Sequence, residues 1–154
     1  MKKKTKRMIL VLVLLALAIG GWYGWSEWNR TEKDLTGAKA DFALNAQSLI
    51  AEFEKDTATA SAANRKYADK LISVRGLLAG IDSTDRQYAL SLGDTTNESR
   101  VVCSMDDNHA SEFGHLKRGD SITVIGRFVH GDPPEIEGLG ATVNIRHSVL
   151  DNKK

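Results

Sequence analysis

Cysteine is almost missing from this sequence: Cys103 is the single one among 154 residues. Without a second cysteine no intramolecular disulfide can form, so the hydrophobic core has to stabilise the fold. A lone cysteine could be a reactive thiol or could join two copies of the chain. Free cysteine is nevertheless among the most buried residue types, so we expect Cys103 to lie inside a strand. No cysteine lies near the apolar N-terminal segment, so we expect no lipid attachment there.

Catalytic patterns are also missing. The sequence has no nucleophile placed beside a base, no glycine loop that would cradle a phosphate and no carboxylate pair in a recognisable setting. We therefore expect no enzymatic activity and no cofactor. Asp106, Asp107 and His109 form one small polar group and His130 with Asp132 another, but neither matches a defined metal-ligand spacing. Turn and helix-cap chemistry explains them better than metal binding.

Positive charge is scarce beyond the first few residues. Five of the 21 lysines and arginines lie before residue 8, whereas all 20 acidic residues come after residue 25. The remaining 16 basic residues against 20 acidic ones give the rest of the chain a formal charge of −4. Phosphate backbones bind mainly through lysine and arginine, so this balance disfavours nucleic acid as a partner.

The N-terminal segment carries a long uncharged run over residues 8–25. As a helix with ~1.5 Å rise per residue it would span about 27 Å, close to the hydrocarbon thickness of a bilayer. We predict a transmembrane helix there, with residues 1–7 as a basic cytoplasmic stub. The protein would then be a single-pass protein of the inner (cytoplasmic) membrane, with an extracytoplasmic or periplasmic C-terminal domain. The alternative is a secretory signal cleaved after Ala18, because Ala16-Leu17-Ala18 has the small-x-small form of a cleavage site.

Two helices are predicted next, after a polar linker over residues 26–40. Apolar residues recur from Phe42 to Phe53 with the spacing of an amphipathic helix, and Asp41 or Asn45 could cap it. A second, alanine-rich helix is predicted over residues 57–67. We expect this helical pair, residues 41–67, to begin the domain that occupies residues 41–154.

From Lys70 onward the apolar residues alternate with polar ones, which indicates strands. Five strands are predicted, over residues 72–78, 87–92, 101–105, 122–128 and 143–149, with a short helix over 108–116 before the fourth. This order is typical of the five-stranded OB barrel, which would occupy residues 70–150. Gly76 and Gly126 interrupt two strands, as a sharply bent barrel strand requires. The predicted fold is therefore mainly β with helices: an OB-fold barrel after a helical pair and one transmembrane helix.

Four short motifs stand out in this region: Lys66-Tyr67 at a helix end, Val74-x-Gly76, Val101-x-Cys103-Ser104 and Val124-x-Gly126. Together they resemble the tRNA_anti-like family of OB-fold domains. The resemblance covers about residues 42–150 and implies an OB fold, in a family with many lipoproteins and membrane-anchored proteins. It implies no catalytic or binding residue, and the family name reflects structural kinship rather than tRNA binding. The lipidation cysteine is missing here, and Arg146-His147 stands where some members have a cysteine that could pair with Cys103.

OB folds usually bind ligands on the face of their second and third strands and in nearby loops. The candidate contacts are Gln87, Ser91 and Ser104 on that face, and Asp132, Glu135 and Glu137 in the loop between the last two strands. The face has no aromatic platform and no basic groove, the two features that single-stranded nucleic acid needs. We predict a non-catalytic binding module for a protein or small-molecule partner in the cell envelope. Oligonucleotide or oligosaccharide binding on the barrel face is the alternative, and self-association through the helical pair a third hypothesis.

Overall fold

The computed structural model describes residues 3–28, 34–84, 87–94, 98–135 and 139–151. The chain divides into two compact units, residues 1–33 and residues 34–154. The first contains a single long helix, α1 (Lys3–Trp28). The second contains the other helices and all of the strands in the described residues.

The prediction of a transmembrane helix over residues 8–25 is wrong. Although α1 contains this segment, no helix in the described part of the chain is long and apolar enough to cross a membrane. The aliphatic run ends at Ile19, where glycine and aromatic residues take over. At ~1.5 Å per residue, the run of about 12 residues over 8–19 reaches roughly 18 Å, against a hydrocarbon core of about 30 Å. The single-pass inner-membrane location with an extracytoplasmic domain depended on that helix and is overturned with it.

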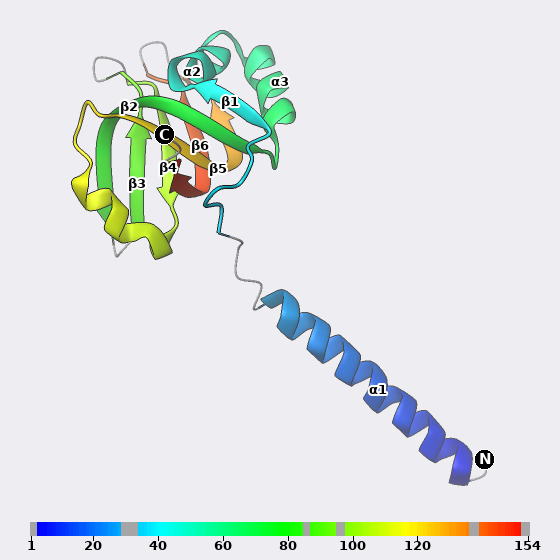
Figure 1. The fold of residues 1–154 in the computed structure, drawn as a ribbon. Coiled ribbons are helices and arrows are strands. Elements are labelled where there is room, and N and C mark those ends of the chain that lie inside the picture. The colour runs from blue at the N-terminus through cyan, green and yellow to red at the C-terminus, as the bar shows by residue number, and fades with distance from the viewer. Residues whose placement is uncertain (1–2, 29–33, 85–86, 95–97, 136–138, 152–154) are drawn as a thin grey trace. The chain divides into compact units, whose positions relative to one another are not determined.

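The second unit is a closed β-barrel, as predicted (Figure 1). Its strands are β2 (Leu71–Thr84), β3 (Gln87–Leu92), β4 (Arg100–Met105), β5 (Ser121–Asp132) and β6 (Thr142–Leu150). They pair in the order β2-β3-β4-β6-β5, and β5 pairs back onto β2 to close the barrel. All of these pairings are antiparallel except β4 with β6. This is the strand order of an OB barrel.

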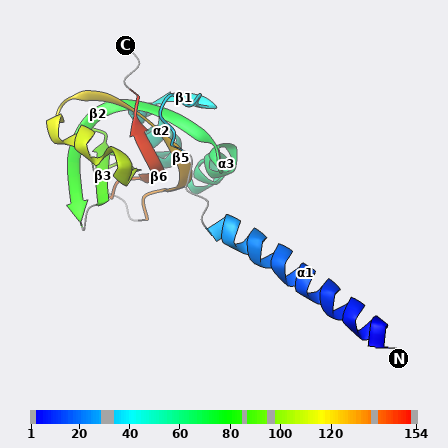
Figure 2. The same ribbon diagram turned by 60° about the horizontal axis from the view of Figure 1, so that its bottom comes forward.

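Helices lie at opposite ends of the barrel (Figures 1 and 2). α2 (Ala46–Glu54) and α3 (Thr57–Tyr67) lie at one end. The other end carries η1 (Asp107–His115), where the sequence predicts a helix over 108–116; it is a 3₁₀ helix.

One strand was not predicted: β1 (Phe42–Asn45), which pairs in parallel with residues 72–75 of β2. The predicted helix therefore begins four residues late, at Ala46. Asn45 caps it as one of the two expected candidates, its side chain accepting a hydrogen bond of 3.0 Å from the backbone N–H of Gln47.

The core follows the predicted alternation along the strands. Inward positions such as Val74, Leu90 and Ile145 are buried between the strands and the helices. Aromatic rings join the helical end to the barrel: Phe53 of α2 stacks on Phe128 of β5, and Tyr67 of α3 lies 5.7 Å from the same ring, centroid to centroid. A second, smaller cluster outside the barrel packs Leu35 against Ile125 and Val149.

β2 changes partners in the middle of its length, close to Gly76. Its first half pairs with β5 as far as Leu77, and from Leu78 it pairs with β3. A Cβ at Gly76 would lie 2.7 Å from the Cβ of Ala46, so α2 can pack here only against glycine. The second half of β2 is therefore not paired with β5, and the edge of β2 on that side is exposed.

Candidate functional site

The face of β3 and β4 on which the sequence predicts ligand contacts is lined by small side chains. In the register of β3 and β4, Ala89 lies opposite Ser104 and Ser91 opposite Val102. Ser104 and Gln87 are exposed, and Ser91 is half-buried. The face is therefore shallow and offers hydroxyl and amide groups.

A groove of about 340 Å³ crosses one end of this face. It is lined by Ala79, Gly80, Ile81, Asp82, Ser91, Asp94, Ser99, Arg100 and Arg118. Of the five predicted contacts that the structure describes, Ser91 alone lines it. Four consecutive residues of β2 line the groove. Because side chains of a strand alternate between its two faces, the groove must follow the backbone of β2 as well as one face of the sheet. A register shift between Leu78 and Gly80 bends the strand here.

The groove carries both signs of charge. A Cβ at Gly80 would lie 3.9 Å from Nη2 of Arg118, so the guanidinium sits directly above this glycine. In the described part of the chain Arg118 is exposed and has no hydrogen-bond or ion-pair partner. Asp82, two residues along the strand from Gly80, is also exposed. Arg118 can therefore meet a carboxylate, and Asp82 a cation, from outside the molecule.

Two other polar groups in the groove have internal partners. Ser99 is buried, donates a short hydrogen bond to Glu54 and accepts one of 3.0 Å from the backbone N–H of Ala141. Arg100 donates from Nε to the carbonyl of Glu98 at 3.3 Å. Ser99 thus fixes the groove wall to α2, and its hydroxyl has no hydrogen left to donate to a ligand.

The edge of β2 beside this groove has no strand partner. Among the described residues, β2 pairs with β1 and β5 only as far as Arg75 and Leu77, and residues 80–84 pair with β3 alone. Figure 2 shows the arrowhead end of β2 lying beside β3. Residues 81–84 are all exposed. Such an edge presents backbone N–H and C=O groups that can pair with another strand.

The loop between β5 and β6, called the acidic loop for Asp132, Glu135 and Glu137, lies near this sheet, but its described residues do not line the groove. Asp132 pairs with Thr142, which pairs with Arg100 on the next strand. Its carboxylate lies 3.0 Å from Nε2 of His130. Glu135 is exposed, and Glu137 lies outside the described residues.

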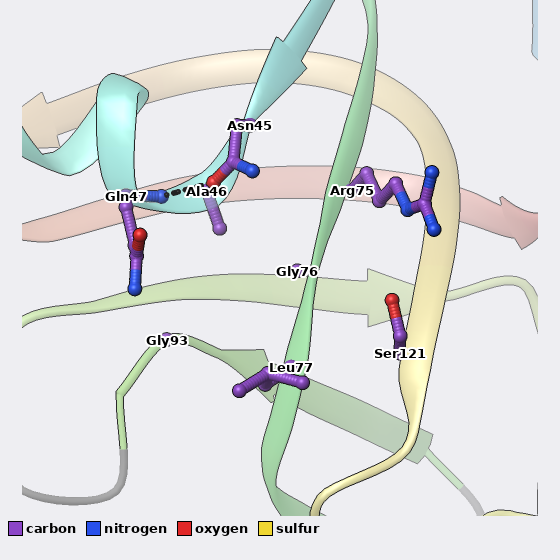
Figure 3. A pocket seen from close by; sticks show the side chains of 8 residues that line it. All are labelled: Asn45, Ala46, Gln47, Arg75, Gly76, Leu77, Gly93 and Ser121. Carbon is purple, nitrogen blue, oxygen red and sulfur yellow. Dashed lines mark hydrogen bonds between the residues drawn. The ribbon is translucent and has the colours of Figure 1, made fainter.

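A second hollow, of about 270 Å³, lies beside the start of α2 (Figure 3). Asn45, Ala46 and Gln47 border it from α2 and its cap, and Arg75, Leu77 and Ser121 from β2 and β5. Figure 3 shows the side chain of Asn45 accepting a hydrogen bond from the backbone N–H of Gln47. The cap therefore already satisfies one of the unpaired N–H groups of the first turn of α2. Among the described residues that line this hollow, Arg75 carries the one charged side chain.

Two titratable residues singled out in the sequence, His109 and Cys103, have raised pKa values. His109 lies between two carboxylates, with Nδ1 2.9 Å from Glu112 and Nε2 3.2 Å from Asp34. These hydrogen bonds, first to Glu112 and then to Asp34, raise the pKa of His109. Burial raises the pKa of the Cys103 thiol to about 12, which makes it unreactive at neutral pH. Among the residues with a described placement, no group of three His, Cys, Asp or Glu could hold a metal ion.

The barrel order and the open groove on its face define a small OB-fold domain of the binding type. A family model described as tRNA_anti-like matches residues 1–132, and the chain belongs to this family. No curated protein matches the sequence.

Several solved structures share the general arrangement. One, from Klebsiella pneumoniae subsp. pneumoniae MGH 78578, is described provisionally as a nucleic acid-binding lipoprotein; it is 15% identical, with 70% of this chain and 89% of that chain covered and a TM-score of 0.49. The OBody NL8, bound to hen egg-white lysozyme, is 18% identical over 55% of this chain and 96% of its own, with a TM-score of 0.35. Asparaginyl-tRNA synthetase from Pyrococcus horikoshii is 17% identical over 55% of this chain and 20% of its own, with a TM-score of 0.36. Because each TM-score is below 0.5, these structures say nothing about what this chain binds.

Proposed function

We propose that this domain is a non-catalytic module that binds an extended polypeptide segment in the groove between β2, β3 and Arg118. The observation that carries the proposal is the open edge of β2 beside a groove that is lined by both Arg118 and Asp82. An extended peptide can pair its backbone with such an edge, while its side chains meet the charges beside it.

Other ligand classes fit this groove less well. Single-stranded nucleic acid binds on aromatic side chains in a basic groove, whereas no aromatic residue is among the described residues that line this groove, and Asp82 and Asp94 are. Small-molecule sites are enclosed and mostly apolar, whereas this groove is open and its lining is largely polar. Oligonucleotide and small-molecule ligands are therefore the weaker alternatives.

The remaining predicted contacts would extend the same surface. Gln87 and Ser104 lie on β3 and β4 beside Ser91, and Asp132 lies two strands from Arg100. We propose that they form the outer part of the surface, together with Glu135 and Glu137 of the acidic loop, and contribute less than the groove does.

A selection from a random-peptide library displayed on phage, with the full chain as the target, tests the function. Peptides should be enriched, and Ser91→Trp should abolish their binding by filling the groove. Ser61→Trp is the matched control, because Ser61 is exposed on α3, a helix that contributes no residue to the groove. Labelled oligo(dT) at low salt is the competing probe, since low salt strengthens any attraction to phosphates.

The proposal is overturned if no peptide is enriched, or if the enriched peptides bind the Ser91→Trp variant as well as the wild type. Binding of oligo(dT) that Ser91→Trp removes would overturn it in favour of nucleic acid.

A further inference from the structure

We propose that the polypeptide bound in this groove is the same β2 edge of a second copy of the chain, so that the domain forms a symmetric dimer. This inference rests on the function proposed above and names the partner of that site. In a two-fold symmetric contact the same patch is used by both copies, so the patch has to be complementary to itself.

The charges of the groove have this self-complementarity. If two copies of β2 run antiparallel with Ile81 opposite Ile81, then Gly80 of each copy lies opposite Asp82 of the other. Directly opposed residues of antiparallel strands place their Cβ atoms ~5 Å apart. The guanidinium of Arg118 lies above Gly80, 3.9 Å from where a Cβ would be. Each Arg118 would therefore meet Asp82 of the second copy, which gives two equivalent ion pairs.

The centre of the same register is apolar. Ile81 is 38% exposed although its partner across the β3 ladder, Leu90, is fully buried. In the dimer the two Ile81 side chains would lie opposite each other on the face away from the arginines. The same register would therefore cover an exposed apolar side chain and pair two charges per copy.

The backbone of this segment is suited to the contact as well. The backbone N–H of Gly119 donates to the carbonyl of Leu78 at 2.8 Å, and that of Leu78 donates to the carbonyl of Asp120 at 2.9 Å. The loop before β5 therefore pairs with this edge of β2 only as far as Leu78. Beyond this point alternate residues of β2 direct their N–H and C=O groups away from β3. Gly80 has no side chain that would obstruct the approach of a second strand. A ladder from Ala79 to Ser83 is therefore available to a second copy.

Charge reversal in sedimentation-equilibrium experiments on the full chain provides the test. The wild type should show a concentration-dependent dimer. Asp82→Arg would set two guanidinium groups against each other across the contact, and Arg118→Asp would set two carboxylates against each other. Each variant alone should therefore lose dimerisation, with a dissociation constant raised at least about tenfold, as like charges directly opposed across paired strands repel.

An equimolar mixture of the two variants should recover the dimer. In the mixed contact one ion pair is the original Arg118 with Asp82, and the other is re-formed with its two charges exchanged. Arg75→Asp is the matched control: it reverses an exposed arginine on the part of β2 that pairs with β5, and should leave the dimer unchanged.

Circular dichroism spectra identical to the wild type would show that the variants fold. The inference fails if the wild type is monomeric, if either single variant dimerises like the wild type, or if the mixture stays monomeric. A monomeric wild type that still binds selected peptides, and loses them with Arg118→Asp, would leave the proposed function standing and remove only the second copy as its partner.

Discussion

Gly126 lies where β5 packs tightly against β6, beside a register shift between Ile125 and Arg127. A Cβ at this position would lie 2.5 Å from both Cγ2 of Ile145 and Oγ of Ser148, two buried side chains, and 3.2 Å from the backbone carbonyl oxygen of Arg146. We expect Gly126→Ala to lower the free energy of unfolding by about 1–3 kcal/mol, as overpacking of a core does. Urea denaturation measures this change. Gly114→Ala is the control, since a Cβ at Gly114 would have no neighbour within 4 Å, and an equal loss in both variants would contradict the packing argument.

His109 connects η1 to the segment that precedes β1. Both ring nitrogens face carboxylate oxygens, those of Glu112 and Asp34, and a neutral imidazole can donate to only one of them. The folded state therefore favours the protonated ring, and its pKa lies above the ordinary value of 6.5. Because the folded pKa is raised, the stabilisation is fully present below the unfolded pKa and is lost as the pH rises through the folded pKa.

This predicts a pH-dependent difference between the wild type and His109→Gln. The melting temperature of the wild type should exceed that of the variant on the acidic side of neutrality. The difference should shrink as the pH rises beyond the folded pKa. Circular dichroism melts from about pH 5 to pH 9 cover this window. A difference that grows toward alkaline pH would show that the neutral ring stabilises the fold.

Much of the residue-level pattern could be predicted from the sequence. The alternation along Ile72, Val74 and Leu78 identified buried side chains correctly, because one face of a barrel strand must be apolar. The burial of Cys103 was predicted because free cysteine is among the most buried residue types. Arg118 was not identified as part of a site, because its position above Gly80 depends on how the loop before β5 passes β2. No local pattern encodes such a contact between residues so far apart in sequence.

At the level of elements, the start of α2 shows how tertiary pairing can override local preference. Phe42, Ala43 and Leu44 suit a helix, and their spacing continues the apolar stripe of the helix that follows. They nevertheless form a strand, because residues 72–75 of β2 offer an open edge for them to pair with. Helix propensity differs by only a few tenths of a kcal/mol among such residues, so the pairing decides the structure.

The cap residue at Asn45 marks the change from strand to helix. Asn45→Ala removes the hydrogen bond from its side chain to the backbone N–H of Gln47, and we expect it to cost about 1 kcal/mol of unfolding free energy. Chemical denaturation monitored by circular dichroism measures the cost. Gln47→Ala serves as the control because it keeps the backbone donor and the cap. If both variants lose the same stability, the cap is not what sets the start of α2.

At the scale of the whole molecule, barrel closure creates the site. β2 spans residues 71–84 because it has to pair with β5 at one end and with β3 at the other. A strand shared in this way stops pairing with β5 before the strand itself ends, so the last residues of β2 have an exposed edge. The five-stranded barrel and its strand order could be predicted from the alternating segments, whereas this edge could not, because it depends on where one strand changes its partner.

Amide hydrogen exchange by NMR at low and high protein concentration tests the central claim, that the open edge of β2 pairs with the same edge of a second copy of the chain. Alternate amides between Ala79 and Thr84 should exchange more slowly at high concentration. Residues 72–75, which already pair with β1 and β5 on both sides, should not change. Unchanged exchange along residues 79–84, with new protection appearing on α2 and α3 instead, would place association on the helices and contradict the account.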